Sequence, residues 1–219
     1  MSNSSGSVTG PGDETRTRIL ETAWQHVRER GTADVTIAQI AVAAGVSRQL
    51  VYFHFANRAG LLTAMARHRD HASGFAEQAA RSRAMDPIEG LEHLLRAWCA
   101  YLPQILPVAR ALEAALVTGD EGGSAWRDRM GELREAIRIA TDRLDRHGQL
   151  ADGWTADAAA DWAWSRIQPT TWQHLVGERG WSADDYMERT VDSLLGELIA
   201  ATASATRGPK TSPSARPPR

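Results

Sequence analysis

Apolar residues recur every three or four positions along most of the chain, and no convincing stretch alternates apolar and polar residues as a strand would. The pattern predicts an all-α protein. The first helix is expected at about 15–30, the second begins at Thr36 and the third follows Ser47. Longer helices are expected at about 57–82, 87–102, 105–118, from the loop at 119–123 to about His147, and at 155–178 and 182–202.

The second and third predicted helices are joined by a tight turn. Thr36 and Gln39 have the spacing of a capping box, Gly45 is suited to end the second helix, and Ser47 is suited to cap the third. Helix, tight glycine turn and helix form the helix-turn-helix arrangement. A plain helical hairpin would carry the same local signals. The residues on the outward face of the third helix must therefore distinguish a DNA-binding helix-turn-helix from such a hairpin.

The third predicted helix has more aromatic residues than it can bury, because Tyr52, Phe53 and Phe55 lie within four consecutive positions. At 100° per residue, Val51 and Phe55 face the first two helices. The opposite side and its flanks then carry Arg48, Gln49, Leu50, Tyr52 and Phe53.

This outward set has the chemistry of major-groove recognition. Arginine can donate two hydrogen bonds to guanine, and glutamine can pair with adenine. Leu50 and Phe53 can contact thymine methyl groups, whereas Tyr52 and His54 can donate to phosphates. Arg58, beside the free backbone N–H groups that start the next helix, can hold a phosphate. The alternative is a hairpin in which Tyr52 is part of the core.

Charge supports binding of a polyanion at the N-terminal end. Residues 14–70 have a net charge of +3, whereas residues 71–202 have a net charge of −8. Residues 1–13 and the basic tail at 203–219 are predicted to be disordered. No apolar run is long enough for a membrane span, no secretory signal is recognisable and Cys99 is the single cysteine, so a cytoplasmic location is expected.

Residues 15–62 resemble the DNA-binding domain of TetR (tetracycline-repressor-like) regulators. The shared features are the first helix ending at Gly31, the segment TIAQIAVAAGVS, and Tyr52, His54, Phe55, Arg58, Leu61 and Leu62 in YFHFANRAGLL. The resemblance implies a three-helix DNA-binding domain at 14–57 and a larger ligand-binding and dimerisation domain at 58–202. It also implies that Thr36, Tyr52, His54 and Arg58 contact phosphates, and that Arg48, Gln49 and Leu50 face bases. Ala59-Gly60 departs from the family's acidic or polar pair, so a looser start of the fourth helix is expected.

The larger domain is rich in tryptophan. By family resemblance, its helices surround a pocket for a small, largely apolar ligand. The expected lining residues are Trp98, Tyr101, Met130, Leu133, Ile137, Trp162, Arg166, Gln168 and Trp172. Two alternatives remain open at this point: the tryptophans simply fill the core, and Arg166 forms a salt bridge instead of anchoring an acidic ligand.

The helix expected at 155–178 carries two apolar stripes, which indicates packing between two neighbours. The resemblance implies a homodimer formed through the last two helices. Its interface is expected to include Trp164, Leu175, Val191, Leu194, Leu195 and Leu198. The alternative is a monomer whose own helices cover both faces.

Three functional hypotheses remain. The favoured one is a dimeric transcriptional regulator, a repressor released from a palindromic operator in double-stranded DNA by a small-molecule effector. The second is a ligand-independent DNA-binding protein with a packed body. The third is a small helical enzyme using His93 or His174, which is disfavoured because no motif joins a nucleophile, a base and an orienting group. His68 and His71 have metal-pair spacing without a further ligand, so neither a metal nor a cofactor is expected.

Overall fold

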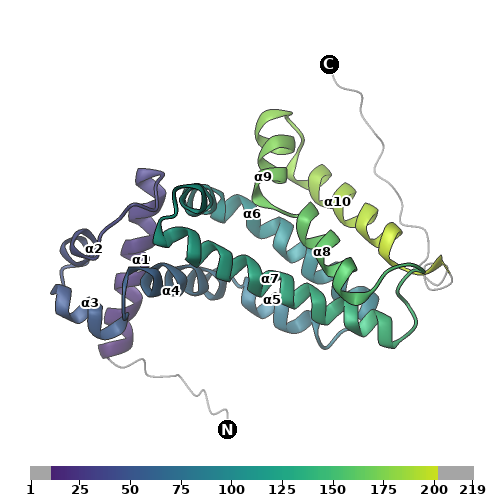
Figure 1. The fold of residues 1–219 in the computed structure, drawn as a ribbon, viewed down its shortest axis with the longest axis horizontal. Helices are drawn as coiled ribbons and strands as arrows, with labels where there is room; N and C mark the ends of the chain where they lie inside the picture. Colours follow the sequence, from purple (N-terminus) through teal and green to yellow (C-terminus); the bar gives the residue numbers. More distant parts are fainter. Residues whose placement is uncertain (1–10, 202–219) are drawn as a thin grey trace, which may run out of the picture.

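The computed structural model describes residues 11–201, which form a succession of helices in two adjoining parts (Figure 1). A small bundle of α1 (Pro11–Arg30), α2 (Ile37–Ala43) and α3 (Arg48–His54) lies at one end. The only β pairing in the described range is an isolated bridge between Leu150 and Ile199. The prediction of an all-α protein is confirmed.

The second and third helices begin where their capping residues predict. The Thr36 main-chain N–H donates to Gln39 Oε1 at 2.8 Å, and the Gln39 N–H donates to Thr36 Oγ1 at 3.2 Å, which completes the capping box. Ser47 Oγ accepts from the Leu50 N–H at 3.1 Å. Gly45 between them has φ of +66°, a conformation that favours glycine. The helix-turn-helix is therefore fixed by local chemistry.

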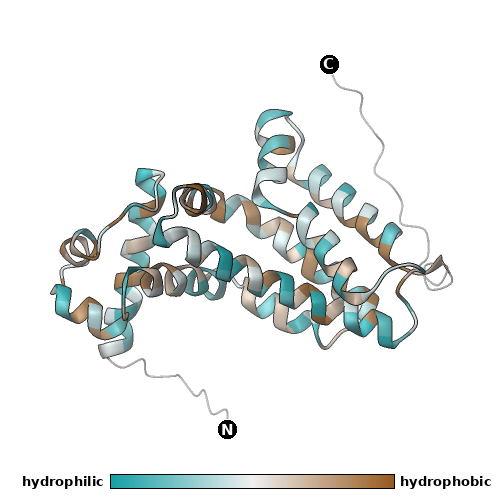
Figure 2. Ribbon diagram, viewed as in Figure 1, coloured by the Kyte–Doolittle hydropathy of each residue, from teal (hydrophilic) through white to brown (hydrophobic). Residues whose placement is uncertain are grey.

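The larger bundle is built around two long neighbouring helices, α6 (Pro87–Thr118) and α7 (Glu121–Arg146). Helices α4 (Arg58–Ala72) and α5 (Phe75–Ser82) pack on one side of this pair. The remaining elements are α8 (Ala156–Arg166), α9 (Pro169–Trp172), the π-helix η1 (Gln173–Glu178) and α10 (Ala183–Leu198). Hydrophobic and hydrophilic residues alternate around most of these helices, as amphipathic packing requires (Figure 2).

Several predicted helix boundaries are wrong. Helix α1 begins at Pro11, within the predicted disordered leader, because proline suits a first helical turn. The helix predicted at 57–82 is broken at Gly74, whose φ is +80°. The helices predicted at 87–102 and 105–118 are one helix, whose internal Pro103 and Pro107 are exposed to solvent. The helix predicted at 155–178 stops at Arg166 and restarts at Pro169. Residues 1–10 and 202–219 of the predicted leader and tail lie outside the described residues.

One apolar core continues from α1 through to α10. At its centre Trp98 is fully buried, and its indole Nε1 donates to the Ile167 carbonyl at 2.8 Å. That bond satisfies the main chain at the break between α8 and α9. Because the core is shared, the position of α4 against the larger bundle also sets the position of the small one.

The close approach of α6 and α7 supplies a stability prediction. A Cβ added at Gly123 would lie 2.8 Å from the Leu116 main-chain nitrogen, whereas a Cβ at Gly131 on the same helix meets nothing within 4 Å. We expect Gly123→Ala to lower the free energy of unfolding by about 1–3 kcal/mol through overpacking. Gly131→Ala should raise it by about 0.4–1 kcal/mol. Urea denaturation of both variants measures these changes, and equal effects would contradict this packing.

Candidate nucleic-acid interface

Helix α3 presents its two faces as the sequence predicted. Val51 is fully buried and Phe55 is 5% exposed, whereas Phe53 is 82% exposed and Tyr52 is 54% exposed. Arg48 and Gln49 are exposed as well, and Leu50 is half-buried. The polar and aromatic side therefore points to solvent, and the apolar side faces α1 and α2.

The scaffold behind this face is firmly packed. The Val46 N–H donates to the Ala41 carbonyl at 2.9 Å, which closes the turn between α2 and α3. The Arg16 guanidinium of α1 lies 5.3 Å from the centre of the Phe55 ring and covers it. The orientation of α3 is thus fixed by contacts that leave its outer side free.

The neighbouring helix α2 has an exposed apolar residue that was not among the predicted site residues. Val42 on α2 is 81% exposed. Its position outside the apolar stripe of α2 (Ile37, Ile40, Ala41 and Ala44) was a signal for this exposure. His54 is half-buried and packs edge-on against Phe53, with ring centres 5.4 Å apart. Thr36 is exposed, although its hydroxyl is already engaged in the capping box.

Arg58 does not point to the outer side. Its Nε donates to the Val35 carbonyl at 2.6 Å, its Nη2 donates to the Ala33 carbonyl, and its Nη1 pairs with both carboxylate oxygens of Asp120 at 2.9 and 3.0 Å. The predicted phosphate contact is incompatible with this geometry. The physical reason is Asp120, which caps α7 and lies 62 residues further along the chain. No local pattern predicts that partner.

Comparison with known proteins identifies the family. Residues 19–65, which include α2, α3 and the first half of α4, match the model of "Bacterial regulatory proteins, tetR family". The chain belongs to the TetR family. It is a DNA-binding transcriptional regulator, and the curated proteins that it resembles are transcriptional regulators too.

Similar TetR-family proteins match most of the chain. The transcriptional repressor BepR of Brucella suis is 26% identical over 85% of this chain and 93% of its own length. A putative regulator from Saccharomonospora viridis, solved in complex with choline, is 25% identical over 85% of this chain and 98% of that one, with a TM-score of 0.64. The triclosan complex of SmeT, from Stenotrophomonas maltophilia, is 20% identical over 94% of this chain and 100% of that one, with a TM-score of 0.67. The SmeT likeness shows the fold.

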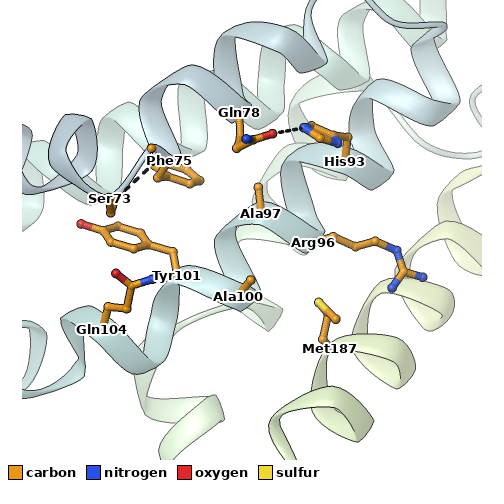
Figure 3. A pocket seen from close by; sticks show the side chains of 11 residues that line it. Ser73, Phe75, Gln78, His93, Arg96, Ala97, Ala100, Tyr101, Gln104 and Met187 are labelled. Atoms are coloured by element: carbon orange, nitrogen blue, oxygen red, sulfur yellow. Dashed lines mark hydrogen bonds between the residues drawn. The ribbon is translucent and has the colours of Figure 1, made fainter.

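A cavity of about 390 Å³ lies among α5, α6 and α10 (Figure 3). The rings of Phe75 and Tyr101, stacked with centres 5.3 Å apart, form one wall. Its polar side holds His93, whose Nε2 lies 2.9 Å from Gln78 Oε1. Met187 of α10 and Arg96 of α6 lie opposite the aromatic wall (Figure 3). We call this the α5–α6 cavity.

The aromatic wall touches a buried ion pair. Arg129 Nε of α7 lies 2.5 Å from Asp70 Oδ2 of α4, and the guanidinium lies over Phe75 and Trp98 at 5.4 and 5.2 Å from the ring centres. Burial raises the pKa of Asp70, although Arg129 and the Tyr101 hydroxyl oppose that shift. Burial and the nearby Asp70 raise the pKa of Tyr101, so its hydroxyl stays protonated and is a donor beside the carboxylate.

Most of the predicted pocket residues do not line this cavity. Tyr101 does, whereas Trp98, Met130, Leu133, Ile137 and Trp172 are buried in the core. Trp162 donates to Glu197 at 2.8 Å and lies 5.0 Å from the Arg166 guanidinium, and Gln168 Nε2 donates to the Trp164 carbonyl at 2.7 Å. In this structure these side chains form contacts between helices, so their role in binding a ligand stays a prediction.

The predicted dimer interface needs a similar correction. Val191, Leu194, Leu195 and Leu198 are at most 4% exposed, because they cover the chain's own core. Leu175 and Trp164 are half-buried, and Trp164 Nε1 donates to the Met130 carbonyl at 2.9 Å. The leucine spacing of α10 indicates its inner face.

Within residues 11–201, no helix has the length and apolar character to span a membrane, and no group of His, Cys, Asp or Glu side chains suits a metal ion.

The Arg58 network supplies a matched test on one helix. Arg58 and Arg67 both join α4 to α7, but the Arg58 side chain is 16% exposed and the Arg67 side chain is 56% exposed. We expect Arg58→Met to lower the free energy of unfolding by about 3–5 kcal/mol, because Asp120 loses its partner. Arg67→Met should cost about 0–1 kcal/mol. Denaturant unfolding of both variants compares them, and a small effect of Arg58→Met would rule out the buried network.

Proposed function

We propose that the chain is a dimeric repressor that binds a palindromic operator through α3. The observation that carries the proposal is the free outer side of α3, where Arg48, Gln49 and Phe53 are exposed while Val51 and Phe55 are fixed in the core. Arg48 and Gln49 are assigned to base edges, and Leu50 and Phe53 to thymine methyl groups. Tyr52, His54 and Thr36 are assigned to phosphates.

Substitutions of Arg48 and of Tyr52 test the predicted base contact and the predicted phosphate contact separately. We expect Arg48→Ala to cost about 1–3 kcal/mol of binding at its own base pair and to relax the preference there. Tyr52→Phe should weaken all sequences alike, because a phosphate contact reads no base. Selection of bound genomic fragments followed by anisotropy titration measures both. Unchanged sequence preference after Arg48→Ala would show that the recognition face is misplaced.

We infer that the dimer forms through the outward faces of α8, η1 and α10. Apolar residues that are incompletely buried on α8 and η1 are Trp162, Trp164, Leu175 and Val176. A two-fold dimer would place two α3 helices in successive major grooves, about 34–36 Å apart. In this arrangement residues 14–57 read the operator and residues 58–202 hold the dimer and the effector.

The α5–α6 cavity is proposed as the effector site. Its volume and its Phe75–Tyr101 wall suit a small, largely apolar molecule. The S. viridis regulator solved with choline supports a small-molecule ligand for this fold. Because Tyr101 adjoins Asp70 of α4, a molecule that displaces the ring alters the Asp70–Arg129 pair and with it the position of α4. Only a difference in affinity between the two arrangements releases DNA, typically worth about 1–3 kcal/mol.

Filling the cavity tests this assignment. Ala97 lines it, whereas Ala80 on α5 is exposed and does not. We expect Ala97→Trp to keep operator affinity and to lose the response to compounds that release DNA from the unmodified chain, because the new indole occupies their space. Ala80→Trp should respond normally. Fluorescence anisotropy of labelled operator DNA across a small-molecule library provides the measurement, and an undiminished response of Ala97→Trp would place the effector elsewhere.

A further inference from the structure

A second cavity of about 410 Å³ lies between α1 of the small bundle and α4. We call it the α1–α4 groove, and it shares no lining residue with the α5–α6 cavity. The side chains that matter for its chemistry are Arg18, Trp24 and His26 on α1, and Met65, His68 and Arg69 on α4. His68 was considered in the sequence analysis as half of a metal pair; the other five were not candidate site residues, and none of the six is used by the proposed DNA contacts.

Arg69 differs from the other partly or fully buried arginines of residues 11–201. Five of them have a carboxylate within 4.0 Å, and Arg143 donates to two main-chain carbonyls; the five are Arg58, Arg96, Arg129, Arg134 and Arg138. Arg69 has one long hydrogen bond, from Nη2 to Gln104 Oε1 at 3.4 Å, and its buried Nε has no partner among the described residues. A guanidinium in this position is incompletely compensated, which favours an anion as its partner.

The groove offers further donors and little opposing charge. His26 Nε2 is also buried without a hydrogen-bond partner in the described part of the chain. Arg18 is exposed at the groove and forms no ion pair within residues 11–201. The one carboxylate there, Glu21, has a largely exposed side chain and lies 3.8 Å from His68 Nε2. The groove is therefore lined by two arginines and a single carboxylate, an excess of positive charge.

The floor of the groove is apolar. Trp24 is 8% exposed and Met65 is 1% exposed, and the Arg69 guanidinium lies 5.4 Å from the centre of the Trp24 ring. A guanidinium held over an indole has one face packed and its edge free for a planar carboxylate. An inorganic anion would bind the positively charged side chains but would make no contact with the apolar floor.

We propose that the α1–α4 groove binds a small organic carboxylate, with the carboxylate on Arg69 and His26 and its apolar body on Trp24 and Met65. Binding requires the Arg69 and His26 side chains to turn, because both unpartnered nitrogens are buried in the empty groove. Because the groove joins the DNA-binding bundle to α4, its occupant contacts both sides of that joint. The site is separate from the α5–α6 cavity, although Arg69 contacts Gln104, which lines that cavity.

Calorimetric titration of the full chain with 1-naphthoate tests the proposal. We expect saturable binding that weakens by about tenfold or more in Arg69→Gln, because a charged hydrogen bond is lost. Ala72→Trp should block binding by filling the groove from its exposed edge, without removing a charge. Arg83→Gln, at an exposed arginine outside the groove, is the matched control and should bind as the unmodified chain does.

Three comparisons make the result decisive. The neutral analogue 1-naphthalenemethanol should bind at least about tenfold more weakly than 1-naphthoate. Inorganic phosphate that binds as tightly as 1-naphthoate would overturn the organic carboxylate assignment. Loss of naphthoate binding in Ala97→Trp but not in Arg69→Gln would place it in the α5–α6 cavity and overturn the groove. Absence of saturable naphthoate binding to the unmodified chain would overturn it as well, while leaving the operator and effector proposals untouched.

Discussion

The attachment of α4 to α7 is the constraint on which the rest of the structure depends. Ion pairs join the two helices at three points: Arg58 with the α7 cap Asp120 and with Glu121, Arg67 with Glu132, and Asp70 with Arg129. The Asp70–Arg129 pair is buried and the Arg58–Asp120 pair is partly buried. The two have opposite polarity, so α4 contributes the cation near its start and the anion near its end. Sliding α4 by one turn would put at least one of these charges against an apolar surface, which is costly. Since α4 also packs on α1, this register determines where α3 faces.

The same attachment explains why a cavity beside α5 can matter for DNA binding. Asp70 is held by Arg129, and Arg129 is held in turn by the faces of Phe75 and Trp98. Phe75 stacks on Tyr101, which forms the wall of the α5–α6 cavity. A ligand bound in this proposed effector site would therefore reach a buried charge through one layer of side chains. A buried ion pair responds sharply to small displacements, because its attraction offsets a large desolvation cost only at close range.

How far the sequence predicts this structure depends on the range of the interaction concerned. The helix-turn-helix was predictable because Thr36, Gln39, Gly45 and Ser47 act on neighbours within three residues. The exposure of Phe53 and the burial of Phe55 follow from helical geometry alone. The role of Arg58 was not predictable in this way, because its partner Asp120 belongs to another helix. The leucines of α10 were assigned to a partner chain for the same reason: periodicity shows that a face is apolar, but not which surface covers it.

Proline positions show the same limit. Pro103 and Pro107 predict a break, yet α6 continues because both lie on its solvent side, where neighbouring carbonyls can reach water. Pro169 does coincide with a break, because the Ile167 carbonyl there accepts from the buried Trp98 indole instead of a helical N–H. The difference lies in what replaces the lost helical hydrogen bond. Tertiary contacts thus decide which local signals take effect: at the end of α8, the hydrogen bond from the Trp98 indole lets the helix stop where its sequence pattern continues.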